Sequence, residues 1–537
     1  MKRLNKEHGI ALLAGAACVA GFAPFGQYLA PVLALALLFG LWLRAETPRA
    51  AAGLGFAFGL GLFTAGVNWI YVALHDYGHM PAWLAAPALL LFAAFLALFP
   101  ALAGYSQARI LSKCALPDLP PAVAPVAGRV AKIRGVELVL PVLVMSASWV
   151  GIEWLRGMIF TGFPWLTLGY AHSASPLAGY APLLGVYGVS LLAALSAALL
   201  ASLLPVILRD RTLLFRDMWR LGALALLVAL WAGGAALRGV AWTQPEGEPF
   251  TVTLVQGNIP QDTKFDPEVL NDTLDIYRRL AMQNPAHLTV LPETAFPVLR
   301  EQVPYELLDQ MREQARRNSG DVLVGVFERD QGGYYNSVFS VGASDNALAE
   351  HEPHYRKHHL VIFGEFIPLR PLLGWFINDV LQIPMGDLAR GDSRQPPLAV
   401  AGQRVAVNIC YEDVFGEEII TALPEATVLV NVTNDAWYGD SYAADQHNQM
   451  SQFRALEAGR MMLRATNTGV TSIIDVNGRM LQRLPQHQQA VLQGRAQGYQ
   501  GMTPYARLGN AGVLLLIALM LAGAWGWARR YQSGARA

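Results

Sequence analysis

Val405-Ala406-Val407-Asn408-Ile409-Cys410-Tyr411-Glu412-Asp413 is the stretch that decides the fold of the second half of this chain. An alternating apolar run ends abruptly at Cys410, and acidic residues follow at once. This pattern is typical of a buried strand whose end turns outward into a polar pocket. The chain has three cysteines, and the other two, Cys18 and Cys114, lie in or beside long apolar segments. Cys410 is therefore the cysteine placed to act as a nucleophile.

The composition indicates that much of the chain lies in lipid. Of its 537 residues 53% are hydrophobic and 15% are charged, and the mean hydropathy is +0.32. A soluble domain typically has about 25% charged residues. The net charge of zero argues against a nucleic-acid-binding surface. Three scattered cysteines form no disulfide framework, and the sequence contains no CxxC pair that would suggest a zinc site.

Eight long apolar stretches predict eight transmembrane helices, because a spanning helix needs about 20 mostly apolar residues. They lie at about 8–25, 28–43, 51–74, 82–105, 136–155, 183–207, 219–240 and 508–527. Lys2, Arg3 and Lys6 precede the first stretch, as they would in a signal peptide. Further spans follow it and no small-residue cleavage site is evident, so we interpret it as a helix that stays in the protein.

The basic residues predict the orientation in the membrane. Both ends of the chain and the loops after the second, fourth and sixth stretches carry Lys or Arg, whereas the loops after the first and third carry neither. This pattern places both termini in the cytoplasm and the long insert outside, in the periplasm of a bacterium. We therefore predict a seven-helix membrane domain over residues 1–242, an external domain over 243–506, and a final helix with a short tail over 507–537.

The insert predicts an α/β layered domain, because strand-like runs alternate with polar helical segments. The predicted helices are Pro267–Gln283 and Tyr305–Asn318. The predicted strands are Phe250–Val255, Leu288–Leu291, Val322–Phe327, Ser337–Val341, Val405–Ile409, Ala426–Val432 and Thr471–Val476.

Two further segments place chemistry beside predicted strands. Glu293 ends the apolar run Leu288–Leu291, and Lys357 and Glu365 bracket an apolar stretch. A carboxylate, an ammonium and a thiol form a workable set for acyl transfer. The carboxylate takes the thiol proton, while the ammonium lowers the thiol pKa and stabilises an oxyanion. The residues alone also allow an interpretation without catalysis. In it, Cys410 is an inert buried thiol, Glu293 is a salt-bridged acid and Lys357 is a solvated lysine.

These segments resemble the nitrilase superfamily, and the eight spans narrow the resemblance to the apolipoprotein N-acyltransferase family. The resemblance covers essentially the whole chain. Two positions depart from the family pattern: Ile362 replaces a usual proline and Phe265 a common tryptophan, which affects local loop shape rather than chemistry. The matching motifs are LPETAFP with Glu293, YRKHHLVIFGEFIP with Lys357, NICYED with Cys410, Asn431–Trp437 and Arg464–Gly469.

The resemblance implies an αββα sandwich attached to a helical membrane domain, in the inner membrane of a bacterium. It implies that an acyl chain moves from the sn-1 position of a phospholipid, such as phosphatidylethanolamine, to the α-amino group of an S-diacylglyceryl cysteine in an apolipoprotein. Glu293 would act as the base, Cys410 would carry the acyl chain as a thioester, and Lys357 would stabilise the thiolate and the oxyanion. No cofactor is implied.

Other residues receive supporting roles. Glu365 would orient Lys357 or the amine, and Tyr411 and Glu412 would flank the nucleophile, with Glu412 shaping the charge of the pocket. His359 would brace the loop that carries Lys357.

Several aromatic residues are candidates for contact with lipid. The unusually apolar segment 372–377, with Trp375 and Phe376, is interpreted either as an arm that enters the outer leaflet or as ordinary packing. Trp437 and Tyr438 would form a second aromatic edge, although aromatic residues at a strand end are more often part of a core.

The sequence leaves three alternative interpretations open. The cluster of His351, His354, His358 and His359 has the spacing of metal ligands, but solvated, hydrogen-bonded residues explain it better, and no metal is expected. A membrane-tethered amidohydrolase with water as acceptor would use the same Glu, Lys and Cys. A transporter or ligand-binding scaffold would not need those three residues at strand ends.

Overall fold

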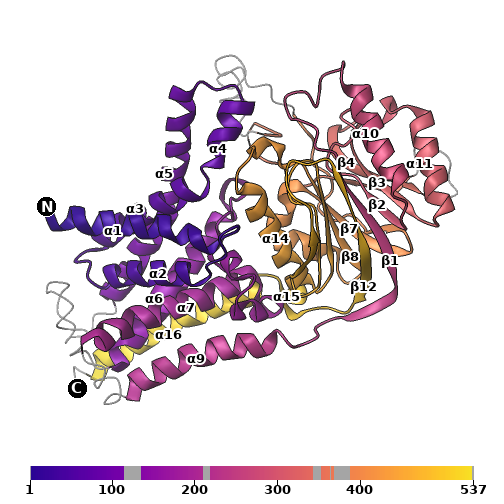
Figure 1. The fold of residues 1–537 in the computed structure, drawn as a ribbon. Coiled ribbons are helices and arrows are strands. Elements are labelled where there is room, and N and C mark those ends of the chain that lie inside the picture. The colour runs from indigo at the N-terminus through magenta and orange to yellow at the C-terminus, as the bar shows by residue number, and fades with distance from the viewer. Residues whose placement is uncertain are drawn as a thin grey trace. The chain divides into compact units, whose positions relative to one another are not determined.

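The computed structural model describes residues 2–113, 135–209, 218–342, 352–362, 364–367 and 387–534 (Figure 1). The chain forms two compact units. The first unit holds Met1–Asn68, Ala86–Val240 and Leu508–Ala537. The second unit holds Trp69–Ala85 and Ala241–Arg507. It thus joins the α/β region to a short segment from the N-terminal half of the chain.

The first unit consists of helices, and each of the eight predicted apolar stretches overlaps one of them. These helices are α1 (Lys2–Cys18), α2 (Leu29–Trp42), α3 (Pro48–Gly66), α5 (Ala82–Lys113), α6 (Gly135–Arg156), α7 (Ala181–Arg209), α9 (Met218–Leu237) and α16 (Ala511–Gly534). Within the described residues, 5 helical stretches are long and apolar enough to cross a membrane, and Leu29–Trp42 and Ala511–Trp527 are shorter apolar helices. The helical membrane unit is confirmed, and the count of eight crossings stays a prediction.

Glycines allow α1 and α3 to pack closely. A Cβ atom on Gly15 would lie 1.9 Å from the carbonyl oxygen of Phe58, and one on Gly61 would lie 2.0 Å from that of Leu12. Small residues of this kind let helix backbones approach one another where lipid supplies no hydrophobic driving force.

The third predicted span, residues 51–74, extends beyond its helix. The helix α3 ends at Gly66, and α4 (Trp69–Val72) and a π-helical turn (Ala73–Tyr77) follow. The ring of Trp69 meets the ring of Tyr438 edge-on, with centroids 4.6 Å apart. The apolar end of the stretch therefore packs within the second unit instead of continuing the helix.

Two six-stranded sheets build the second unit. The first sheet has the order β12 (Ala490–Gln500), β1 (Gln244–Gln256), β2 (Leu288–Val290), β3 (Asp321–Asp330), β4 (Gly333–Gly342) and β5 (His354–Arg356). The second has the order β11 (Met480–Arg483), β10 (Ser472–Ile474), β9 (Met462–Thr466), β8 (Val428–Thr433), β7 (Gln403–Ile409) and β6 (Leu398–Val400). All seven predicted strands are present, although their bounds differ by several residues.

Helices cover the outer face of each sheet (Figure 1). Leu274 of α10 (Leu270–Gln283) and Met311 of α11 (Tyr305–Arg317) share a buried core with Val324 of the first sheet. Ala455 of α14 (Ala443–Ala458) shares a second core with Leu429 of the other sheet. Shorter helices are α13 (Gly416–Ile419) and α15 (Pro504–Leu508). The predicted αββα sandwich is confirmed.

Parallel strands at the centre of each sheet position the polar residues. The strands β1, β2 and β3 run parallel, and so do β7, β8 and β9. Polar side chains that follow the carboxyl ends of such strands gather at one edge of a sheet. Glu293 follows β2, Cys410 follows β7 directly, and Asn434 follows β8 directly.

Candidate active site

Cys410 sits at the sharp turn where β7 ends and a 3-10 turn (Cys410–Val414) begins. Its side chain is buried, and its backbone has a φ of 54°, in the left-handed region that residues other than glycine rarely adopt. Its carbonyl oxygen accepts hydrogen bonds from Asn431 Nδ2 and from His447 Nε2, each at 3.2 Å. These two donors fix the turn, so the surroundings maintain an uncommon conformation at the nucleophile.

Glu293 lies just beyond β2 with its carboxylate held on both oxygens. Oε1 accepts a hydrogen bond from Asn336 Nδ2 at 2.7 Å, and Oε2 accepts one from the backbone N–H of Asn434 at 2.8 Å. Lys357 Nζ lies 3.5 Å from Oε1. The carboxylate is thus oriented by donors from three different segments before any substrate binds.

Lys357 follows β5 and is buried against carboxylates. Its Nζ donates to Glu365 Oε1 at 2.8 Å, in addition to its contact with Glu293. Burial by itself would lower the pKa of Lys357, but the Glu365 and Glu293 charges raise that pKa above its ordinary value. Lys357 therefore carries a positive charge at any physiological pH.

Glu365 is placed to orient Lys357. Its Oε1 accepts from Lys357 and, at 3.4 Å, from Asn336 Nδ2, while Oε2 accepts from the backbone N–H of Val361 at 2.9 Å. Asn336 thus contacts both carboxylates that face the lysine. Asn336 was not predicted, because a single asparagine in a strand gives no sequence pattern, and Asn434 was recognised only as part of the motif Asn431–Trp437, without a role.

The Cys410 thiol is surrounded by charges of both signs. Burial and the Glu293 charge raise its pKa, Lys357 lowers it, Asp435 raises it, and a hydrogen bond with the Thr433 side chain lowers it. The net result is a pKa well above the ordinary value for cysteine. The Lys357 ammonium lowers the thiol pKa as expected, but burial raises this pKa by more, because a buried thiol loses the solvation that would stabilise its thiolate.

Glu412 anchors backbone, and it also lines a pocket together with Tyr355 and His358. It accepts hydrogen bonds from the backbone N–H groups of His358, His359 and Ile409 and from the hydroxyl of Tyr355. It therefore ties the segment after β5 to the turn that carries the nucleophile. Burial raises the pKa of Glu412 to about 7, although the backbone hydrogen bonds and Lys357 lower it.

His359 and Tyr411 form an aromatic group beside this anchor. The ring of His359 stacks on Phe415 with centroids 3.7 Å apart, and its Nδ1 lies 2.7 Å from Glu418 Oε1. Tyr411 is buried and meets the same Phe415 ring edge-on at 5.3 Å. These contacts place His359 and Tyr411 as packing partners around the segment that leads to Lys357.

The aromatic candidates for lipid contact fall into two groups. Trp437 is 44% exposed and its ring lies edge-on to Tyr77, with centroids 6.2 Å apart. Tyr438 packs on Trp69, and burial together with the nearby charge of Cys410 raises the pKa of its hydroxyl well above the ordinary value. Trp375 and Phe376 lie outside the described residues.

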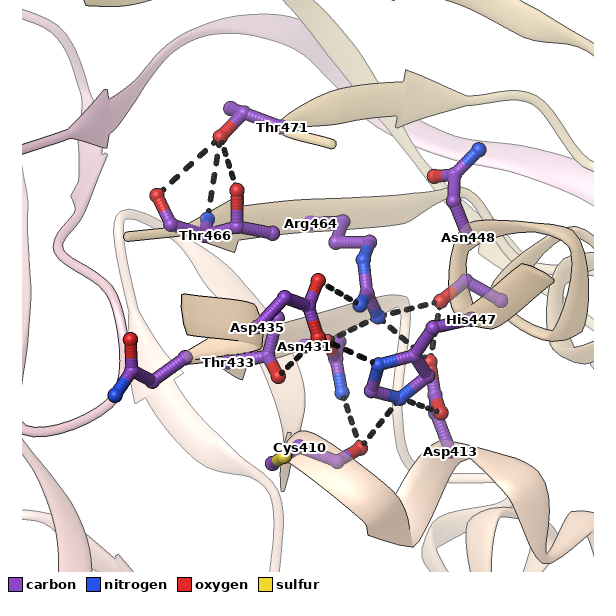
Figure 2. A network of polar contacts seen from close by, with 12 residues as sticks. Cys410, Asp413, Asn431, Thr433, Asp435, His447, Asn448, Arg464, Thr466 and Thr471 are labelled. Atoms are coloured by element: carbon purple, nitrogen blue, oxygen red, sulfur yellow. Dashed lines mark hydrogen bonds and ion pairs between the residues drawn. The ribbon is translucent and has the colours of Figure 1, made fainter. Parts of the chain in front are cut away.

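A network of buried charges lies behind the nucleophile (Figure 2). His447 donates through Nδ1 to Asp435 Oδ1 at 2.9 Å and through Nε2 to Asp413 Oδ1 at 2.8 Å. Arg464 donates to Asp413 Oδ2 at 2.9 Å and to Asp435 Oδ2 at 3.1 Å. Ser451 Oγ also donates to Asp413. Each acid thus contacts both bases, so the four charges balance.

The pKa values of this network follow from that balance. Burial would raise the pKa of Asp413 and Asp435, but His447 and Arg464 lower both below the ordinary value. Burial and Arg464 would lower the pKa of His447, but the two aspartates raise it to about 9. Figure 2 shows the Cys410 carbonyl oxygen joined to this network while the sulfur points away from it.

The histidine-rich segment offers no evidence of a metal site. Among the described residues, no group of three or more His, Cys, Asp and Glu side chains could hold a metal ion. His354 and His358 instead lie 3.3 and 2.8 Å from backbone carbonyl oxygens through Nδ1. His351 lies outside the described residues.

Comparison with known proteins adds family evidence to this geometry. Residues 14–199 match the family model described as "Apolipoprotein N-acyltransferase N-terminal domain". Residues 251–499 match the model described as "Carbon-nitrogen hydrolase". The second match includes Glu293, Lys357 and Cys410.

Curated relatives match along nearly the whole chain. The apolipoprotein N-acyltransferase of Nitrosomonas europaea is 51% identical over 512 residues, which cover 94% of each chain. That of Ralstonia nicotianae is 44% identical over 100% of this chain and 96% of its own. The apolipoprotein N-acyltransferase of Methylococcus capsulatus is 44% identical over 93% of this chain and 92% of its own.

Proposed function

This chain belongs to the apolipoprotein N-acyltransferase family, and on that premise we propose that Glu293, Lys357 and Cys410 transfer the acyl chain through a thioester on Cys410. One observation carries the proposal. Lys357 Nζ lies 3.5 Å from the Glu293 carboxylate, and the charges of both residues act on the buried Cys410 thiol. A base, a cation and a nucleophile therefore meet at one point.

In the first half-reaction, Glu293 accepts the thiol proton as Cys410 sulfur attacks the carbonyl carbon of the sn-1 ester of a phospholipid. A high thiol pKa makes this base necessary, because the resting thiol is protonated. Lys357 stabilises the negative charge on the ester oxygen in the tetrahedral intermediate. The ester C–O bond then breaks, Glu293 returns the proton to the departing glycerol oxygen, and a lysophospholipid leaves.

In the second half-reaction, the α-amino group of an S-diacylglyceryl cysteine at the start of an apolipoprotein attacks the thioester carbonyl. Glu293 takes a proton from the amine as the C–N bond forms. The C–S bond breaks, the sulfur regains a proton, and an amide is released. Glu365 keeps Lys357 in place through both steps, because its carboxylate is bound to Lys357 Nζ at 2.8 Å.

The cellular setting of the proposal is the bacterial inner membrane. The chain has the apolar helices of a membrane protein of this family. We propose that both termini are cytoplasmic and that residues 243–506 form a periplasmic catalytic domain, because basic residues occupy alternate loops. The proposed donor is phosphatidylethanolamine, and the proposed acceptor is the diacylglyceryl lipoprotein.

Intact-protein mass spectrometry tests the first half-reaction. The purified full-length protein is incubated in detergent with phosphatidylethanolamine alone, beside a Cys410→Ala variant. We expect a mass gain of one acyl chain that hydroxylamine removes and that the variant lacks. Lysophospholipid that accumulates continuously without an acceptor would instead indicate a hydrolase, with water attacking the thioester. The absence of any adduct would contradict the thioester mechanism.

A further inference from the structure

A second lysine lies at the same site. Residues 243–506 contain 18 arginines and only two lysines, Lys264 and Lys357. Both lysine side chains are 1% exposed. Arginine cannot lose its charge in proteins, whereas a buried lysine is a compact charge whose pKa shifts readily. The use of lysine at just these two buried positions sets Lys264 apart from the basic residues on the surface of the domain.

Lys264 binds the segment that carries Glu293. Its Nζ donates to the carbonyl oxygen of Glu293 at 3.1 Å and to Thr294 Oγ1 at 2.6 Å. Among the described residues, no carboxylate lies within ion-pair distance of this ammonium. A buried ammonium whose hydrogen-bond acceptors are both neutral is expensive to desolvate, so Lys264 is not explained by a gain in stability.

Thr294 has a backbone conformation that needs such support. Its φ is 45°, in the left-handed region that β-branched residues rarely adopt. The strand β3 also holds the segment, through hydrogen bonds from Leu291 N to Leu323 O at 2.9 Å and from Phe296 N to Gly325 O at 3.1 Å. Lys264 adds two hydrogen bonds, to the carbonyl oxygen of Glu293 and to the hydroxyl of Thr294, on the two residues that this turn joins.

We propose that Lys264 is a positioning residue that fixes the peptide between Glu293 and Thr294 and thereby aims the Glu293 carboxylate at the nucleophile. The inference rests on the proposed function, in which Glu293 is the base. The carboxylate reaches Asn336 Nδ2 and Asn434 N from a backbone whose next residue, Thr294, adopts this left-handed turn. The charges of Glu293 and Cys410 both act on Lys264, which places its ammonium beside the reacting groups.

Single-turnover acylation measures this role. The full-length protein is mixed with phosphatidylethanolamine, and the rate constant and the amplitude of adduct formation are followed by mass spectrometry. We expect Lys264→Met to lower the rate constant about 100-fold with an unchanged amplitude and an unchanged KM, because a displacement of about 1 Å at a catalytic group has that effect. A purely structural role would instead lower the amplitude and the unfolding temperature and leave the rate constant unchanged.

Thr294 provides a matched pair of variants. Thr294→Ser keeps the hydroxyl that Lys264 binds and should retain the wild-type rate constant within a few fold. Thr294→Val keeps the shape but removes the hydroxyl, and should lower the rate constant about tenfold. Lys264→Met combined with Thr294→Val should be no slower than Lys264→Met alone, because both changes remove one interaction.

The possible results separate the two proposals. A normal wild-type adduct with a Lys264→Met rate constant within twofold of wild type would overturn the role of Lys264 and leave the thioester mechanism standing. A wild-type protein that forms no adduct would overturn the mechanism and this inference with it. If Lys264→Met fails to fold, equal rate constants for Thr294→Ser and Thr294→Val would overturn the role of Lys264, and a slower Thr294→Val would support it.

Discussion

Replacing His447 by glutamine should destabilise the α/β unit strongly, because it breaks a buried charge balance. Asp413, Asp435, His447 and Arg464 are each 0% exposed and contact one another at 2.8–3.1 Å. With both acids charged and both bases protonated their charges sum to zero. His447→Gln leaves one uncompensated negative charge, and breaking a buried ion pair in this way costs about 3–5 kcal/mol. For a domain of this size the unfolding temperature should fall by roughly 6–20 °C.

The pH dependence provides a signature of the same network. The folded pKa of His447 is raised to about 9, above the unfolded value near 6.5. The contribution of protonated His447 to the stability of the folded state is therefore fully present below pH 6.5 and is lost as the pH rises through about 9. Thermal unfolding in detergent at a fixed scan rate, at several pH values between 6.5 and 9, should show a falling unfolding temperature for the wild type. His447→Gln should lack that part of the fall.

Two further variants make the reasoning refutable. His447→Gln with Asp435→Asn restores charge balance, so it should lose at least 1 kcal/mol less than the sum of the single changes. Asn448→Ala removes a neighbouring neutral hydrogen bond, the 2.7 Å bond from Ser472 Oγ, and should leave the pH dependence as in the wild type. A His447→Gln shift below about 2 °C, or strict additivity in the double variant, would refute the charge-balance argument.

The remaining predictions concern catalysis and lipid binding. Glu365→Gln removes the carboxylate that holds Lys357 Nζ at 2.8 Å, so kcat should fall at least tenfold with little change in the KM for phospholipid. An equal rise in KM would assign Glu365 to substrate binding instead. Trp437→Ser removes an aromatic side chain that is 44% exposed, and should raise the apparent KM for phospholipid several-fold while kcat stays unchanged. An unchanged KM would exclude Trp437 as a lipid contact.

The strands and helices with clear periodicity were predictable from the sequence. The strand ending at Cys410 and the helices α10 and α11 follow the predicted segments closely, because each has an alternating or amphipathic pattern. The helix α14 was not predicted, since its many polar residues are spread around the helix without periodicity and nearly all of its residues are buried. Strands β9 and β12 were missed for related reasons: β9 is wholly buried and carries Arg464, and β12 is rich in glutamine and glycine.

The active-site residues were predictable where they end an apolar run. Glu293 and Cys410 stand out because a reactive side chain follows soon after a buried strand ends. Lys264 and His447 do not stand out, since one lies in a loop and the other in a polar segment with no visible periodicity. Their importance depends on distant partners, Thr294 for Lys264 and Asp413 for His447, which only the fold brings within hydrogen-bond distance. The thiol pKa also required the structure, because the degree of burial decides its direction.

The pairing of β1 with β12 has a consequence for how the protein is made. These two strands are the first and the last of the α/β unit, and they pair from Gln244 opposite Gln500 to Gln256 opposite Ala490. Until the ribosome has synthesised residue 500, β1 is an unprotected sheet edge, which other extended chains can join. The sheet is completed almost at the moment when the last apolar helix, α16, is synthesised. A protein truncated before residue 490 should therefore aggregate during biosynthesis rather than yield a shorter enzyme.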